Sequence, residues 1–111
     1  EMMRMMIRMA LETEGFDIVG EAKDGEEAIK LYAEHEPDVV TLDIAMPNQD
    51  GIVTCRKIIE MDPNANVVMV TAVGQEARIR EAVLAGARDF IVKPFEPERI
   101  ISAIKKACGL A

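Results

Sequence analysis

Three polar residues stand near the ends of three apolar, β-branched segments of this 111-residue chain. Asp43 lies in "DVVTLDI", Thr71 in "NVVMVTA" and Lys93 in "DFIVKP". Together they form a set suited to handling a phosphoryl group, because a carboxylate can attack phosphorus and hold it as an acyl phosphate. Lys93 would supply a fixed cation, and Thr71 would donate its hydroxyl to a phosphoryl oxygen. A carboxylate that attacks an anion also needs a divalent metal, normally Mg²⁺ held by oxygen ligands.

Each of these residues alone has an ordinary explanation, since an Asp, Thr or Lys at a strand end is usually a cap or a solvated group. The placement of all three residues at strand ends is stronger evidence for a shared site than any one of them. In an open parallel sheet, function lies in the crevice beyond the carboxyl ends of the strands. Three buried strands that each bring one polar group to this rim therefore indicate a single site.

The elements that would position the three residues alternate along the chain. Apolar residues at helical spacing, with capping residues and Pro or Gly at the boundaries, predict helices and strands in turn. The expected helices cover residues 2–14, 24–36, 52–61, 79–86 and 97–108, and the expected strands cover 16–22, 38–44, 66–72 and 89–94. This alternation requires right-handed crossovers and a parallel sheet. We expect one α/β domain over residues 1–111.

Composition excludes several classes of function. Half of the residues are apolar and 30% are charged, which is typical of a globular domain. The net charge of −7 disfavours nonspecific binding to nucleic acid or anionic lipid. Cys55 and Cys108 lack metal-ligand spacing, and we interpret them as reduced thiols of a cytoplasmic protein. No apolar run is long enough to span a bilayer, so no membrane partner is expected.

The motifs resemble those of the receiver domains of two-component response regulators. They are "TLDIAMPNQDG", "VTA" and "AGARDFIVKPF", which occur in the family's order and spacing over the whole chain. The short chain, with "MMRMM" and "GQEARIREAVLAGARDFIVKPF", is most similar to the stand-alone chemotaxis type. The resemblance implies a flavodoxin-like three-layer αβα sandwich with strand order 2-1-3-4-5, and a signalling role rather than an enzymatic one.

The resemblance also implies roles for individual residues. Asp43 matches the aspartate that accepts phosphate from a histidine kinase, and it is a ligand of Mg²⁺ together with the backbone carbonyl of Ala45. Thr71 matches the switch hydroxyl and Lys93 the family's lysine. Phe90 matches an aromatic residue that moves with Thr71, and a cis bond to Pro94 is expected. The implied output is binding to a protein target such as a flagellar motor switch component.

One departure from the family pattern concerns the first strand and its pair of acids, which supply the remaining magnesium ligands. By family spacing, Glu1 falls just after them, so neither is present in this sequence. Without that strand we expect a gap of about 10 Å in the sheet. The strand would then be supplied upstream or by another chain, or the strands would pair anew, as in a strand-swapped homo-oligomer.

Two alternatives to the phosphoacceptor hypothesis remain open. The first is a truncated, engineered or pseudo-receiver fragment that binds proteins or oligomerises without phosphoryl chemistry, because its metal site is incomplete. The second is a flavin-binding flavodoxin. It is disfavoured because no Ser/Thr-rich phosphate loop follows any expected strand and only 4% of residues are aromatic.

Overall fold

A parallel sheet forms the centre of the structure, a computed structural model that describes residues 2–44, 50–72, 76–93 and 95–109. Within these ranges the sheet has three strands in the order β1-β2-β3, and both pairings are parallel. The strands are β1 (Val40–Asp43), β2 (Val67–Ala72) and β3 (Asp89–Lys93). The α/β class and the parallel sheet predicted from the sequence are therefore confirmed.

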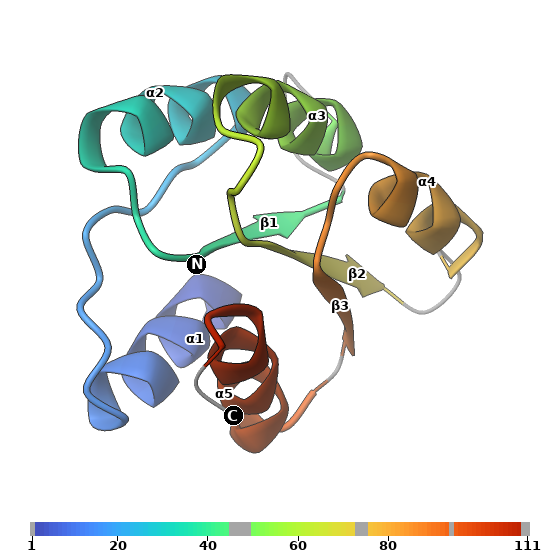
Figure 1. Ribbon diagram of the computed structural model, residues 1–111. Coiled ribbons are helices and arrows are strands. Elements are labelled where there is room, and N and C mark those ends of the chain that lie inside the picture. The colour runs from blue at the N-terminus through green and yellow to red at the C-terminus, as the bar shows by residue number, and fades with distance from the viewer. Residues whose placement is uncertain (1, 45–49, 73–75, 94, 110–111) are drawn as a thin grey trace.

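Helices cover both faces of this sheet, giving three layers (Figure 1). One face carries α2, α3 and α4, and the other carries α1 and α5. The bounds of the helices are α1 (Met2–Thr13), α2 (Gly25–His35), α3 (Gly51–Met61), the 3₁₀ turn η1 (Glu76–Arg78), α4 (Ile79–Leu84) and α5 (Pro97–Ala107). None of the helices in the described ranges has the length and apolar character needed to cross a bilayer.

The central strand β2 is the most deeply buried element. Five of its six residues are buried, because both of its faces are covered. Val67 and Met69 pack in the cluster beneath α2 and α3, whereas Val68 packs against Ile100 and Ile104 of α5. This alternation is what a strand between two helical layers requires.

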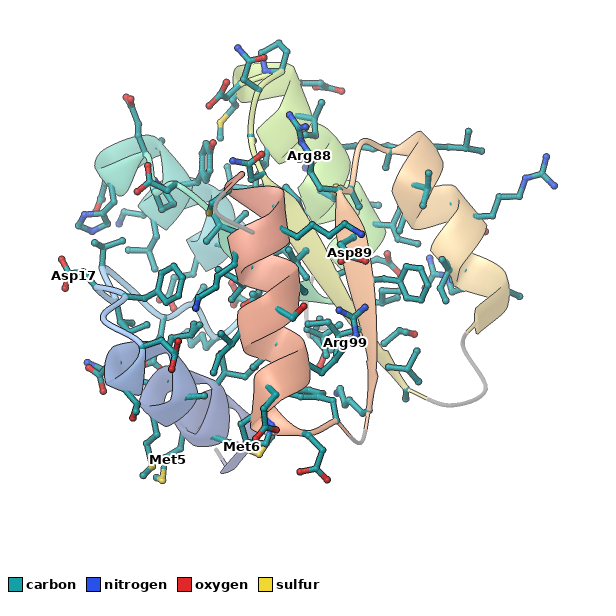
Figure 2. The ribbon with its side chains drawn as sticks, turned by 60° about the horizontal axis from the view of Figure 1, so that its bottom comes forward. Met5, Met6, Asp17, Arg88, Asp89 and Arg99 are labelled. Atoms are coloured by element: carbon teal, nitrogen blue, oxygen red, sulfur yellow. The ribbon has the colours of Figure 1, made fainter. Side chains whose placement is uncertain are left out.

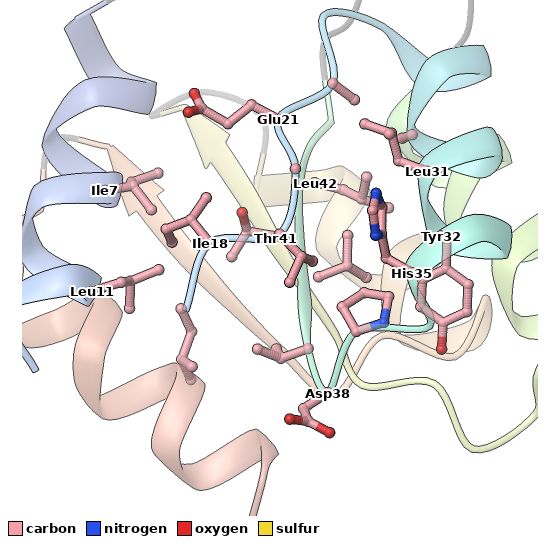
Figure 3. A pocket seen from close by; sticks show the side chains of 18 of the residues that line it. Ile7, Leu11, Ile18, Glu21, Leu31, Tyr32, His35, Asp38, Thr41 and Leu42 are labelled. Atoms are coloured by element: carbon pink, nitrogen blue, oxygen red, sulfur yellow. The ribbon is translucent and has the colours of Figure 1, made fainter. Parts of the chain in front are cut away.

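The predicted strand over residues 16–22 is wrong, since that segment has no regular secondary structure. A strand needs a neighbouring edge for its backbone hydrogen bonds. Here a cavity of about 900 Å³ separates the segment from β1. Ile7 and Leu11 of α1 and Leu31 of α2 line it together with Ile18 and Thr41 (Figure 3).

The same cavity explains why β1 is less buried than predicted. The sequence indicated a strand covered on both faces, yet Val40 and Thr41 are only half-buried and both line the cavity. β1 is the edge strand of the described sheet and pairs with β2 alone. The family order 2-1-3-4-5 places its first strand at this edge, so β1, β2 and β3 correspond to family strands 3, 4 and 5.

Tyr32, the single tyrosine of the chain, provides a test of the packing between α2 and α3. It is buried, and its hydroxyl donates a hydrogen bond of 2.9 Å to Asp62. Burial, followed by this hydrogen bond, raises the pKa of Tyr32 to about 12. The neutral phenol is thus favoured in the folded state, so its stabilising contribution is complete below about pH 10 and is lost as the pH rises through about 12.

We predict that tyrosinate absorbance titrates with a midpoint well above the ordinary value in the folded protein, and that Asp62→Asn lowers this midpoint. The asparagine variant should not restore the ordinary value, since burial remains. Asp17→Asn, at an exposed position, serves as the matched control. A midpoint at the ordinary value for the wild-type protein would contradict the described packing.

Candidate functional site

The strand register sets the positions of the predicted site residues. Asp43 is the register partner of Val70 on β2, while Thr71 and Ala72 are the partners of Val92 and Lys93 on β3. All three polar residues therefore come to the carboxyl rim of the sheet, as the sequence predicted. Ala45 and Pro94, which the sequence associated with this site, lie outside the described residues.

Asp43 and Lys93 are in direct contact at this rim. The Nζ of Lys93 donates a hydrogen bond of 2.7 Å to Oδ2 of Asp43, so the two form an ion pair. The side chain of Lys93 is 32% exposed and that of Asp43 is 21% exposed. The carboxylate is thus reachable from solvent, and a fixed positive charge stands beside it.

Thr71 lies at the same strand end but faces a different layer. Alternation along β2 places its side chain on the face of Val67 and Met69, whereas Asp43 and Lys93 share the other face with Val70. Thr71 is fully buried, and its hydroxyl lies 3.5 Å from the carbonyl oxygen of Ala72. The structure therefore brings Asp43 and Lys93 into contact, whereas Thr71 lies at the same end of the sheet with its side chain on the other face.

Phe90 occupies the face that Thr71 shares. It is the register partner of Met69 and packs against the buried cluster that includes Met69, while remaining half-buried. Arg99 of α5 fixes the backbone here, since its guanidinium donates a hydrogen bond of 2.8 Å to the Phe90 carbonyl and lies 3.6 Å from the Asp89 carboxylate. Figure 2 shows Asp89 and Arg99 side by side on β3 and α5.

The start of α3 supports the backbone that carries Asp43. The N–H of Gly51 donates a hydrogen bond of 2.8 Å to the carbonyl oxygen of Ile44. A Cβ at Gly51 would lie 2.1 Å from the Asp43 carbonyl oxygen and 2.7 Å from the Ile44 Cα. Only glycine, which has no Cβ, allows this approach, so Gly51 is the point of close contact between α3 and the end of β1.

Asp50 begins α3 and was missed as a site residue by the sequence reasoning. Its carboxylate accepts a hydrogen bond of 2.8 Å from the Ile52 N–H, and it forms an ion pair of 2.6 Å with Arg78. Burial acts to raise the pKa of Asp50, but the hydrogen bonds from Arg78 and from the backbone outweigh it and lower the pKa. An Asp directly before a glycine-led helix is an N-cap signal that could have found it.

The magnesium site implied by the resemblance is not complete in the described part of the chain. A Mg²⁺ site in proteins is built from several oxygen ligands. Within residues 2–44, 50–72, 76–93 and 95–109, no group of three or more acidic, histidine or cysteine side chains could hold a metal ion. Asp43 contributes one carboxylate, and Lys93 already binds it. These residues alone do not fit Mg²⁺.

Comparison with known proteins agrees with this geometry. The model of the family described as "Response regulator receiver domain" matches residues 1–105. The chain belongs to the response regulator receiver domain family. The receiver domain is 46% identical to the chemotaxis protein CheY of Thermotoga maritima and 47% identical to that of Bacillus subtilis. Each match covers 94% of this chain and 87% of the relative.

Solved structures place this receiver domain in the same fold. The receiver domain of NtrX from Brucella abortus matches with a TM-score of 0.92 and 29% identity, covering 98% of this chain and 92% of that one. CheY of Borrelia burgdorferi, solved with CheX, BeF₃ and Mg²⁺, matches with a TM-score of 0.89 and 38% identity. That match covers 95% of this chain and 80% of the other.

We predict that Gly51→Ala destabilises the receiver domain by about 3 kcal/mol, because the new methyl group must push the backbone of Asp43 or Ile44 aside. Chemical denaturation monitored by circular dichroism measures this change. Gly20→Ala is the matched control, since a Cβ there would meet nothing closer than a Leu31 methyl group at 3.4 Å. Equal stability of the two variants would contradict the close contact at Gly51.

Proposed function

We propose that this receiver domain accepts a phosphoryl group from a histidine kinase on Asp43 and passes the signal to a protein target. The contact between Lys93 and Asp43 at the carboxyl rim carries this proposal. Attack by Asp43 on phosphorus places negative charge on the phosphoryl oxygens. Lys93 is already positioned to stabilise that charge, which lowers the cost of reorganisation.

The proposed switch uses Thr71 and Phe90. In the described structure Thr71 is turned toward the face of Phe90, away from the face of Asp43 and Lys93. A phosphoryl group on Asp43 offers new acceptor oxygens to the Thr71 hydroxyl. Movement of Thr71 toward that group would empty space next to Phe90, which is half-buried. Because Phe90 has no hydroxyl, the proposed switch depends on the packing of its ring alone.

The partners and location follow from the family and from charge. Stand-alone relatives named as chemotaxis proteins favour a chemotaxis-type output, and we propose a component of the flagellar motor switch as the target. The net charge of −7 favours a partner surface that is basic.

We propose that the protein acts in the cytoplasm and binds neither nucleic acid nor membrane. Any Mg²⁺ binding should be weak with the described residues alone.

Phosphoryl transfer from a small donor such as acetyl phosphate, in buffer that contains Mg²⁺, tests the proposal. We expect the intact mass of the wild-type protein to rise by one phosphoryl group, and Asp43→Asn to abolish this rise because an amide is not a nucleophile of this kind. Lys93→Met should slow the reaction by about 100-fold, since the stabilising charge is lost. Lys93→Arg should retain part of the rate.

Asp17→Asn, which removes an exposed carboxylate of the segment 16–22, is the control for these variants. Circular dichroism establishes that each variant is folded. Phosphoryl incorporation that persists in Asp43→Asn would contradict the assignment of Asp43. A folded wild-type protein that takes up no phosphoryl group would favour the alternative function.

That alternative is a protein-interaction or oligomerising module, and one observation supports it. β1 is an edge strand of the described sheet, and the cavity beside it is lined by apolar residues of α1, α2 and the segment 16–22, together with charged side chains such as Glu21 and Asp38 (Figure 3). Edge strands with an open face recruit other strands. A second copy of the chain would fill this space in a strand-swapped homo-oligomer.

Sedimentation equilibrium of the 111-residue chain tests this alternative. The alternative predicts a dimer or larger oligomer that dissociates when Thr41 is replaced by Pro, since proline at an edge disrupts strand addition. A monomer at all accessible concentrations would exclude it. Val83→Thr, at an exposed position of α4 that does not line the cavity, is the control.

A further inference from the structure

The ion pair between Arg78 and Asp50 joins two connections that follow different strands. Asp50 starts α3, the helix that follows β1 and Asp43. Arg78 ends η1 and is the N-cap of α4, the helix that follows β2 and Thr71. The two charged groups are 2.6 Å apart although they are far apart in the sequence. The pair therefore links the start of the helix that follows Asp43 to the start of the helix that follows Thr71.

Arg78 is held in the orientation that this contact needs. Its guanidinium donates a hydrogen bond to the carboxylate of Asp50 at the start of α3. A second ion pair, of 3.5 Å to Glu81, lies on the other side of the guanidinium. A planar guanidinium can bind two carboxylates with separate N–H groups, whereas an ammonium lacks this fixed geometry.

Asp50 passes this constraint to the phosphoacceptor strand. The same carboxylate that binds Arg78 also caps α3 at Ile52, so it fixes the first turn of the helix. Gly51, within that turn, is hydrogen-bonded to Ile44 and lies against the Asp43 carbonyl. Each step of this path, from Arg78 through Asp50 and Gly51 to Asp43, is a direct contact.

We propose that Arg78 is a positioning residue for Asp43, acting through Asp50 and Gly51. This inference rests on the proposed phosphoacceptor function of Asp43. The pair is more than one-third exposed at Arg78 and one-third exposed at Asp50, so it contributes little to global stability. Its effect is on geometry, because reaction rates depend strongly on small displacements of a reacting group.

Amide hydrogen exchange at Gly51, measured by NMR, reports on this path without any phosphoryl chemistry. We expect Arg78→Gln and Asp50→Asn each to speed exchange of the Gly51 N–H by about fivefold, and to slow phosphoryl uptake from acetyl phosphate by about fivefold. Asparagine retains the N-cap, so Asp50→Asn removes the ion pair alone. The double variant should be no worse than either single variant, and Arg78→Lys should restore part of both effects.

Arg80→Gln removes the next arginine along the chain, which is exposed and lies in α4, and is the matched control. Unchanged Gly51 exchange in Arg78→Gln and Asp50→Asn, relative to Arg80→Gln, would overturn the positioning role. Additive effects in the double variant would overturn it as well. If the wild-type protein takes up no phosphoryl group while Gly51 exchange still responds to both variants, the positioning role is supported and the proposed phosphoacceptor function is wrong.

Discussion

The parallel pairing of β2 with both of its neighbours is the constraint on which the site depends. β2 is buried on both faces and fixes the register of β1 on one side and β3 on the other. Asp43 and Lys93 are separated by the width of this strand, yet their side chains meet at 2.7 Å because both strands end at the same level. A slip of one residue in either pairing would turn one of these side chains to the opposite face.

Much of this arrangement could be predicted from the sequence. Strong apolar runs predicted β2 and β3, and capping signals such as Asp24 predicted the start of α2, where its side chain accepts a hydrogen bond from Glu27. The meeting of Asp43 with Lys93 followed from the rule that parallel strands share a carboxyl rim. Local pattern was sufficient here because each of these features is set by residues close in the chain or by the topology.

The features that could not be predicted depend on contacts in space. Residues 16–22 have the composition of a strand, but a strand forms only when an edge is available, and a cavity lies between this segment and β1. The sequence predicted that Thr71 lies at the carboxyl end of its strand, which is correct. Which face of the sheet its side chain points to depends on how β2 is aligned with its neighbours, because successive side chains alternate between the two faces. The pairing of Asp50 with Arg78 joins helices after different strands, and no spacing in the sequence indicates it.

Chemical mapping of the modified residue tests the central claim most directly. After reaction with a phosphodonor, borohydride reduction converts an aspartyl phosphate into homoserine, which tandem mass spectrometry locates in the chain. The arrangement of Lys93 beside Asp43 predicts homoserine at position 43 and at no other carboxylate. Homoserine at Asp50 or another acidic residue, with position 43 unmodified, would contradict the account.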